Sequence, residues 1–270
     1  LDWIPELNAY GMDWADVYIG LRGARNPFEF KGIPPEKLTA HKKAMGTVSG
    51  MRNDLTRWVL IRVPNESFAQ QAGISHEEMM EFFFQATLRD WAEEAKWYRE
   101  IRDIFQAAKH VRIVGIDTDI EFSTENRIYE VADGHLNMPD GEIFTAPVDD
   151  SATGKIYFDF PAVYFGEKVP GIKLEFSAGK VMKASADGNE ELLNKLIKMD
   201  SGSSRIGEFG IGLNYGIDRF SSDILYDEKI GGTIHIALGR AYPECGGINK
   251  SSLHWDIVKD LRKEGNIYLD

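Results

Sequence analysis

The stretch "GGTIHIALGRAYPECGGINKSSLHWDIV", residues Gly231–Val258, places histidines, a tyrosine and an aspartate within short apolar segments. Alternate residues of a β-strand share a face. In "TIHIALG" the isoleucines and the leucine take one face, and His235 projects from the other among small residues. In "LHWDIV", His254 and Asp256 project together, opposite an apolar face. The pattern predicts two strands that each bury one face and present an imidazole or a carboxylate on the other.

Two further segments repeat this arrangement. "RIGEFGIGLN" alternates apolar residues with Glu208 and two glycines, and glycines leave room for another group to come close. Glu142 follows the turn "NMPDG" and stands at the entry of the strand "EIFTAP". Taken singly, each residue is more often a satisfied core residue or part of a solvated face. Together they match the nitrogen and oxygen donors that bind Zn, Co, Mn or Fe.

The first part of the chain predicts parallel sheet. "ADVYIGLRG" is typical of a buried strand, and a helix is expected over residues 35–53. The strand "RWVLIRVP" (Arg57–Pro64) follows, and residues 74–110 are expected to hold one or two helices. This alternation of strands and helices is typical of a fold with a parallel sheet.

After residue 111 the pattern changes to short alternating segments, separated by Gly, Pro, Asp and Asn, with one helix expected over residues 189–199. The predicted fold class is therefore α/β (α+β). We expect an α/β domain with parallel strands over residues 1–110 and a β-rich, mostly antiparallel, metal-binding catalytic domain over residues 111–270. Because the chain lacks an initiator Met and runs at once into a strand, we expect the first domain to be incomplete at its N-terminus.

Composition narrows the functional classes. The net charge of -12 argues against binding to nucleic acid, whose phosphates would be repelled. No segment approaches the ~20 apolar residues that span a bilayer, so no membrane partner is expected. Cys245 is the only cysteine, which excludes an intrachain disulfide and favours a reducing compartment, the cytoplasm.

At these residues the chain resembles the thermophilic-type metallo-aminopeptidases, the family of aminopeptidases T and S. The matching blocks are "NMPDGEIFTAPVDDSATG", "RIGEFGIGLN", "DEKIGGTIHIALGRAYPECGG" and "NKSSLHWD", which together span residues 137–256. The resemblance implies a site for two divalent ions, Zn, Co or Mn, with Asp256 or Glu208 as the bridging ligand. The implied ligands are Glu142, Glu208, His235, His254 and Asp256. It also implies that Tyr242 lies beside the metals.

The expected activity is therefore hydrolysis of N-terminal amino acids from peptides by a metal-activated water. Glu208 is expected to move the proton of that water, and Tyr242 to donate to the developing oxyanion. Glu228 is the candidate for binding the free α-amine. Peptides are the expected substrates, and the family resemblance and the aromatic helices of residues 79–105 suggest a homodimer.

Two alternatives stay open at the level of sequence. His235, His254 and Asp256 alone form the two-histidine, one-carboxylate set of mononuclear Fe(II) oxygenases. A ring-cleaving dihydroxypyridine dioxygenase is similar to this family, so that chemistry is the first alternative. The second is a non-catalytic binding module with an enclosed structural metal, which would have no pocket beside Tyr242.

Overall fold

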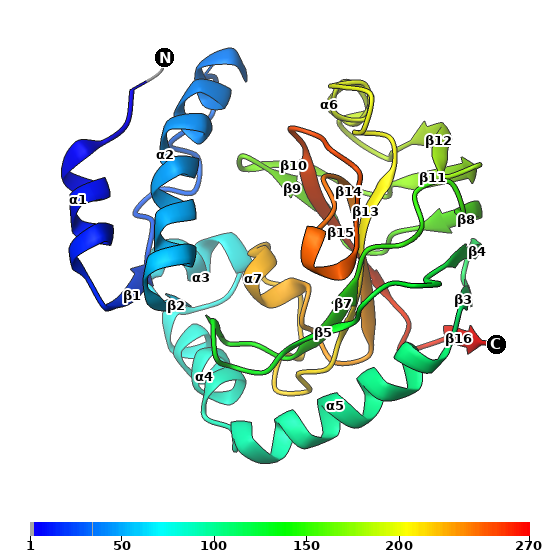
Figure 1. Cartoon of the computed structure of the whole chain (residues 1–270), viewed down its shortest axis with the longest axis horizontal. Coiled ribbons are helices and arrows are strands. Elements are labelled where there is room, and N and C mark those ends of the chain that lie inside the picture. Colours follow the sequence, from blue (N-terminus) through cyan, green and yellow to red (C-terminus); the bar gives the residue numbers. More distant parts are fainter. Residues whose placement is uncertain (1–2, 34) are drawn as a thin grey trace.

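The computed structural model describes residues 3–33 and 35–270 (Figure 1). In its N-terminal part, β1 (Val17–Arg22) and β2 (Arg57–Arg62) pair in parallel, as predicted. The helices α1 (Glu6–Trp14) and α2 (Pro35–Leu55) lie beside them. The third strand of this sheet, β6 (Asn137–Met138), comes from much later in the chain and pairs in parallel with β2.

The prediction that the first strand is buried is wrong. β1 lies at the edge of the three-stranded sheet, and its burial pattern is mostly exposed. Ile19 and Leu21, which share a face, are 62% and 66% exposed. The apolar run correctly predicts a strand, because its residues have high β-propensity. It does not predict burial, because within the described residues no other element covers this face of the strand.

Three helices follow, and each begins at a polar cap. Asn65 caps α3 (Glu66–Ala72), Ser75 caps α4 (His76–Thr87) and Asp90 caps α5 (Trp91–Ala107), each side chain accepting a hydrogen bond from a backbone N–H of the first turn. The expectation of one or two helices in residues 74–110 is confirmed as two, α4 and α5. The long helix α5 runs along the antiparallel strands and buries two of its aromatic residues in their core.

The remainder forms two large antiparallel sheets and a hairpin. The six-stranded sheet has the order β12–β11–β8–β4–β3–β16, and the five-stranded sheet the order β15–β14–β13–β7–β5. The strands of the six-stranded sheet are β3 (His110–Gly115), β4 (Thr118–Ser123), β8 (Thr153–Tyr157), β11 (Lys173–Ser177), β12 (Lys180–Ser185) and β16 (Asn266–Leu269). Those of the five-stranded sheet are β5 (Glu130–Ala132), β7 (Glu142–Thr145), β13 (Ile206–Gly212), β14 (Thr233–Gly239) and β15 (His254–Asp260). The hairpin is β9 (Ala162–Tyr164) with β10 (Glu167–Val169). Short helices are α6 (Glu190–Leu196), α7 (Ile224–Asp227) and the 3-10 turn Pro243–Cys245.

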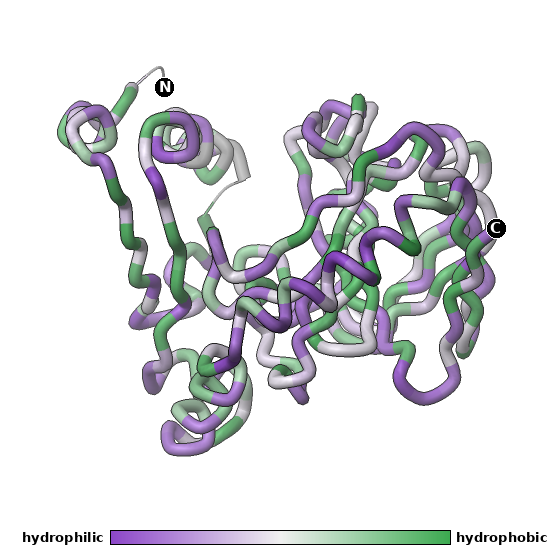
Figure 2. The backbone as a smooth tube through the Cα atoms, turned by 60° about the horizontal axis from the view of Figure 1, so that its bottom comes forward, coloured by the Kyte–Doolittle hydropathy of each residue, from purple (hydrophilic) through white to green (hydrophobic). Residues whose placement is uncertain are grey.

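The main core lies between the two large sheets. Apolar residues of both sheets form one cluster, and the rings of Phe122 and Phe209 meet edge to face, 5.0 Å apart, across it. Figure 2 shows hydrophobic and hydrophilic residues interleaved along these strands. Every residue of β13 and β14 is buried, on both faces. The face of the five-stranded sheet that points away from the main core is therefore covered as well, and it carries the polar residues singled out above.

The mixed α/β class, with a parallel sheet followed by antiparallel sheets, is confirmed. A division into domains at residue 110 stays a prediction. Two features cross that division: β6 completes the first sheet, and α5 packs into the core of the second part. Across the described residues, no helix combines the length and the apolar character needed to cross a membrane.

Candidate metal centre

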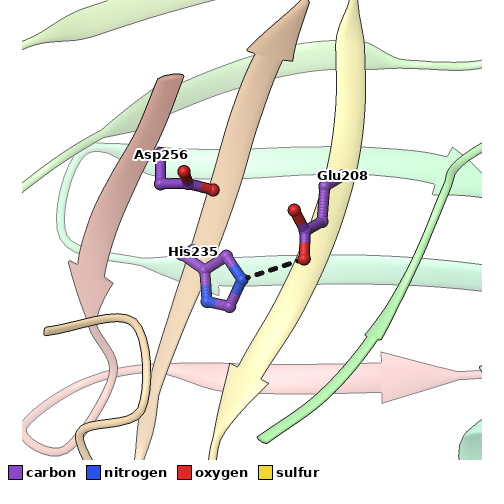
Figure 3. A group of neighbouring side chains, drawn as sticks. All are labelled: Glu208, His235 and Asp256. Carbon is purple, nitrogen blue, oxygen red and sulfur yellow. Dashed lines mark ion pairs between the residues drawn. The ribbon is translucent and has the colours of Figure 1, made fainter. Parts of the chain in front are cut away.

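Strand register places the candidate ligands side by side. In the five-stranded sheet, Glu208 of β13 lies opposite Ala237 of β14, and Ala237 lies opposite Asp256 of β15. The alanine side chain between the two carboxylates is short, so the space above it is available to other atoms. His235, two residues before Ala237, projects from the same face. Single ligand atoms of Glu208, His235 and Asp256 all lie within 4.8 Å of one another (Figure 3).

A glycine makes this approach feasible. Gly210 lies directly opposite His235 in the register of β13 and β14. A Cβ atom built at Gly210 would overlap the imidazole ring of His235. The absence of a side chain at Gly210 lets the imidazole ring occupy this space and reach Glu208. The expectation that glycines beside Glu208 leave room for another group is borne out at this position.

Glu208 lies between the two imidazoles. Its Oε1 is 3.5 Å from Nε2 of His235, and its Oε2 is 3.2 Å from Nε2 of His254. Nε2 of His254 is in turn 3.6 Å from Oδ2 of Asp256. Glu208 therefore presents one carboxylate oxygen to each of the two imidazoles.

Both imidazoles are oriented from behind by backbone carbonyls. Nδ1 of His235 lies 3.1 Å from the carbonyl oxygen of Glu228, and Nδ1 of His254 lies 2.8 Å from that of Arg240. A carbonyl only accepts, so each Nδ1 carries the proton and each Nε2 faces the cluster. This is the arrangement that fixes the tautomer of metal-binding histidines.

Glu142 reaches the cluster from β7. Its Oε2 lies 3.5 Å from Nε2 of His235, and its Oε1 lies 3.4 Å from the ammonium of Lys229. Lys229 is fully buried and also pairs with the carboxylate of Glu228. Glu142 is therefore held between an imidazole and an ammonium at the start of its strand, where the sequence pattern had placed it.

The residues present fit a cation. Oε2 of Glu142, Nε2 of His235 and Oδ1 of Asp256 are buried and have no hydrogen-bond partner. Buried polar atoms are rarely left unpaired, because each costs desolvation free energy without compensation. His235 links these atoms, because its Nε2 lies 3.5 Å from Oε2 of Glu142 and its ring belongs to the same close group as Asp256. Divalent ions coordinated there would satisfy all of them.

Electrostatics inside the cluster favour protonated imidazoles. Burial alone lowers the pKa of each histidine, but the surrounding carboxylates outweigh it and raise the pKa of His235 to about 10 and that of His254 to about 9. Burial alone would raise the pKa of Glu208, but the two neighbouring imidazoles outweigh burial and lower the pKa to about 2. Burial raises the pKa of Asp256 to about 6. The site therefore holds protons at neutral pH that a bound cation would displace.

Tyr242 and Glu228, the other two predicted site residues, line the same pocket. The volume of this pocket is about 580 Å³. Four of the five candidate ligands line it, and the fifth, His235, is buried behind its wall. The hydroxyl of Tyr242 lies 3.5 Å from Nε2 of His254, and burial together with the nearby carboxylates raises the pKa of Tyr242, so the hydroxyl keeps its proton. The structure thus brings together every residue of the predicted site. Their individual roles stay predictions.

Two buried charged residues of the site were missed from the sequence. Lys229 lies in "DEKIGG", which resembles a surface turn, and Asp140 lies in the turn before Glu142. Burial raises the pKa of Asp140 to about 6, and its Oδ2 accepts a hydrogen bond from the N–H of Gly134. No periodic pattern marks either residue. The proximity of "DEK" to the strand of His235 is the only signal that the sequence offers.

Comparison with known proteins decides the family. The model of the thermophilic metalloprotease family M29 matches residues 1–266. The chain belongs to the M29 family. It is 26% identical to aminopeptidase 2 of Geobacillus stearothermophilus, over 90% of this chain and 70% of the relative. It is also 26% identical to aminopeptidase T of Thermus thermophilus, over 90% and 67% of the two chains.

Solved structures agree on the fold. The M29 chain superposes on wild-type AmpT from Thermus thermophilus with a TM-score of 0.84, at 24% identity, over 98% of this chain and 76% of the other. A 2,5-dihydroxypyridine dioxygenase from Pseudomonas putida matches less well, with a TM-score of 0.61 at 15% identity over 97% and 91%. As a member of the M29 family the protein is a metal-dependent hydrolase of the protease class, with curated relatives that are aminopeptidases.

Proposed function

We propose that this M29 protein removes N-terminal amino acids from peptides with two divalent ions, Zn, Co or Mn, at the cluster described above. The observation that supports the proposal best is the convergence of metal-binding side chains from four neighbouring strands, three of whose buried ligand atoms have no hydrogen-bond partner. The proposed ligands are Glu142, Glu208, His235, His254 and Asp256.

Divalent ions held by these residues would supply Lewis acidity, which polarises a scissile carbonyl and makes a nearby water nucleophilic at neutral pH. Glu208, whose low pKa keeps it ionised, is placed to accept the proton of that water and pass it to the leaving amine. Tyr242 keeps its hydroxyl proton and donates a hydrogen bond to the oxygen of the scissile carbonyl as negative charge develops on it. Neither step requires a residue outside the pocket.

The charge of the pocket favours a free amino terminus. Within the described residues the pocket lining includes no Lys or Arg, and the carboxylates are Glu130, Asp133, Asp140, Glu142, Glu208, Glu228, Glu244 and Asp256. We propose that Glu228, oriented by Lys229, binds the α-ammonium group of the substrate. A peptide with a blocked amine would lack this contact, which restricts cleavage to the first residue.

The decisive experiment compares the metal-loaded and chelated protein on aminoacyl anilides and short peptides, with N-acetylated peptides as the control. We expect release of the first amino acid, loss of activity with chelator, recovery with Zn, Co or Mn, and no cleavage of acetylated peptides. Failure of the metal-loaded protein to cleave any unblocked substrate would overturn the proposal.

The two alternatives are less well supported. A mononuclear oxygenase would use His235, His254 and Asp256 but leave Glu142 and Glu208 without a role, although both lie against His235. Oxygen uptake with Fe(II) and a dihydroxypyridine would favour it. An enclosed structural metal conflicts with the 580 Å³ pocket that Tyr242 lines.

For the setting of the enzyme we propose the cytoplasm and a homodimer that binds no nucleic acid. The single, buried Cys245 supports the cytoplasm, and the net charge of -12 supports the lack of nucleic-acid binding. The dimer is supported by apolar side chains of α1 and β1 that the described chain leaves exposed, such as Leu7, Trp14 and Ile19. Sedimentation equilibrium measures the assembly, and a monomeric mass at micromolar concentration would exclude the dimer.

A further inference from the structure

A second cavity, of about 170 Å³, adjoins the metal centre. His254 and Asp256 line both this cavity and the larger pocket, and so does Ile224 at the start of α7. A substrate bound at these two ligands therefore has one of its side chains next to the smaller cavity.

Most residues in the walls of the smaller cavity are apolar, and four of them are aromatic. It lies between the edge strand β15 and the β9 strand, and Trp255 ties the two together, because its indole N–H donates to the carbonyl of Val163 at 3.0 Å. Phe220 forms another wall and is held in place by stacking on Phe160, with the ring centroids 5.0 Å apart. Such walls favour an apolar occupant.

Two carboxylates line this cavity: Asp256 is a proposed metal ligand, and the other, Asp227, does not call for a positively charged occupant. Asp227 accepts hydrogen bonds from the backbone N–H of Ser221 at 2.6 Å and from its hydroxyl at 2.8 Å. Burial raises the pKa of Asp227 well above its usual value, which disfavours the charged form of the group. An apolar cavity of about 150 Å³ is large enough for benzene, so this one accepts a leucine or phenylalanine side chain.

The positions of Glu228 and Asp227 indicate which residue of the substrate places its side chain in the smaller cavity. Glu228, the proposed site for the α-amine, lines the larger pocket, and its neighbour Asp227 lines the smaller one. The α-amine and the side chain of an amino acid branch from the same carbon. A substrate with its amine at Glu228 therefore directs the side chain of its first residue toward the cavity.

We propose that this cavity, walled by Phe220, Trp255 and Tyr164, is the specificity pocket for the N-terminal residue and selects apolar side chains. The assignment rests on the proposed aminopeptidase function and names its substrate class. One methylene in an apolar pocket discriminates by about 10–200-fold, so leucine should be preferred over glycine at least about tenfold.

The first test measures binding, which needs no turnover. The Zn-loaded protein is titrated calorimetrically with L-leucine, glycine and L-lysine, with Phe220→Ala as the test variant and Phe84→Ala as its control. Phe84 is a half-exposed aromatic residue on α4, away from both pockets. We expect leucine to bind at least about tenfold tighter than glycine or lysine, and Phe220→Ala to reduce this ratio severalfold while Phe84→Ala leaves it unchanged.

A second variant narrows the cavity from its exposed side. Ile224 is 43% exposed, so Ile224→Phe should fold normally, and we expect it to weaken leucine binding more than glycine binding. Equal binding of leucine and glycine by the unmodified protein, or tighter binding of lysine, overturns the assignment. Selective leucine binding without hydrolysis of any peptide would instead uphold the pocket and reject the proposed aminopeptidase activity.

Discussion

Lys229 is a fully buried cation among carboxylates. Burial alone lowers the pKa of Lys229, but Glu142 and Glu228 outweigh it and raise the pKa above its ordinary value, so the ammonium stays charged. It holds Glu142 from one side while His235 lies on the other. We infer that Lys229 sets the position of both carboxylates in the protein before metal binds.

Replacing Lys229 by methionine should destabilise the chelated protein by about 3–5 kcal/mol, since it leaves Glu142 and Glu228 buried without their counter-charge. Urea denaturation at pH 7 measures the change. The control is Lys198→Met, an exposed lysine with an expected change within about 0.5 kcal/mol. A loss below about 1 kcal/mol at position 229 would contradict the inference.

Tyr242 is expected to act through its hydroxyl alone. Tyr242→Phe removes that group and keeps the ring, which lies against His254 with a centroid separation of 5.1 Å. If the hydroxyl stabilises the oxyanion, kcat should fall by about 10²–10³-fold with little change in KM. Steady-state kinetics on an aminoacyl anilide measures both constants. A raised KM with unchanged kcat would assign Tyr242 to ground-state binding instead.

At the scale of elements, the alternation of residues along β13, β14 and β15 was the informative signal. A period of two places residues on one of two faces without any knowledge of the partner strand, so the shared face of His235 and Ala237 was predictable. The register that sets Glu208, Ala237 and Asp256 in one row depends on strands far apart in sequence. Lys229 and Asp140 lie in loops, where no period exists to reveal burial.

Replacing Gly210 tests whether the His235 side chain of β14 needs the space that this glycine leaves on β13. Gly210→Ala should displace the imidazole of His235, destabilise the protein by about 1–3 kcal/mol and lower metal affinity. Gly46→Ala is the matched control, because a Cβ there meets nothing within 4 Å and the residue lies inside helix α2. There the same change should stabilise by about 0.5–1 kcal/mol. Thermal unfolding and metal titration of both variants provide the readout, and normal metal affinity in Gly210→Ala would refute the steric argument.

At the scale of the whole molecule, the order of strand and helix segments along the sequence predicts the class of the fold. It does not predict which strands pair with one another in the sheets. Strands with intervening helices, then short alternating strands, gave the α/β part and the antiparallel part in the right order. The pairing of β6 with β2 joins residues about 77 positions apart, Leu60 with Asn137, and no local signal predicts it. The exposure of β1 was missed for the same reason, because burial depends on what else covers the strand.

Metal binding by the whole protein should depend on pH with a defined sign. In chelated protein His235 and His254, with pKa values near 10 and 9, hold protons at pH 7 that must leave before the imidazoles can bind a cation. Raising the pH from 6 to 8 weakens the competition of protons with the cation, so apparent affinity should rise about tenfold per pH unit for each proton released. Competition with a chelator of known affinity measures it. An affinity independent of pH over this range would be incompatible with protonated imidazoles.

Among the described strands, β15 is the outermost of its sheet and pairs with β14 alone, yet it supplies two of the five candidate ligands, His254 and Asp256. A cation bound by these residues together with Glu208 and His235 would cross-link β15 to the two inner strands, β13 and β14. Stripping the metal should therefore let β15 fray: its amide hydrogens should exchange with deuterated solvent faster, while those of β14, flanked on both sides, stay protected.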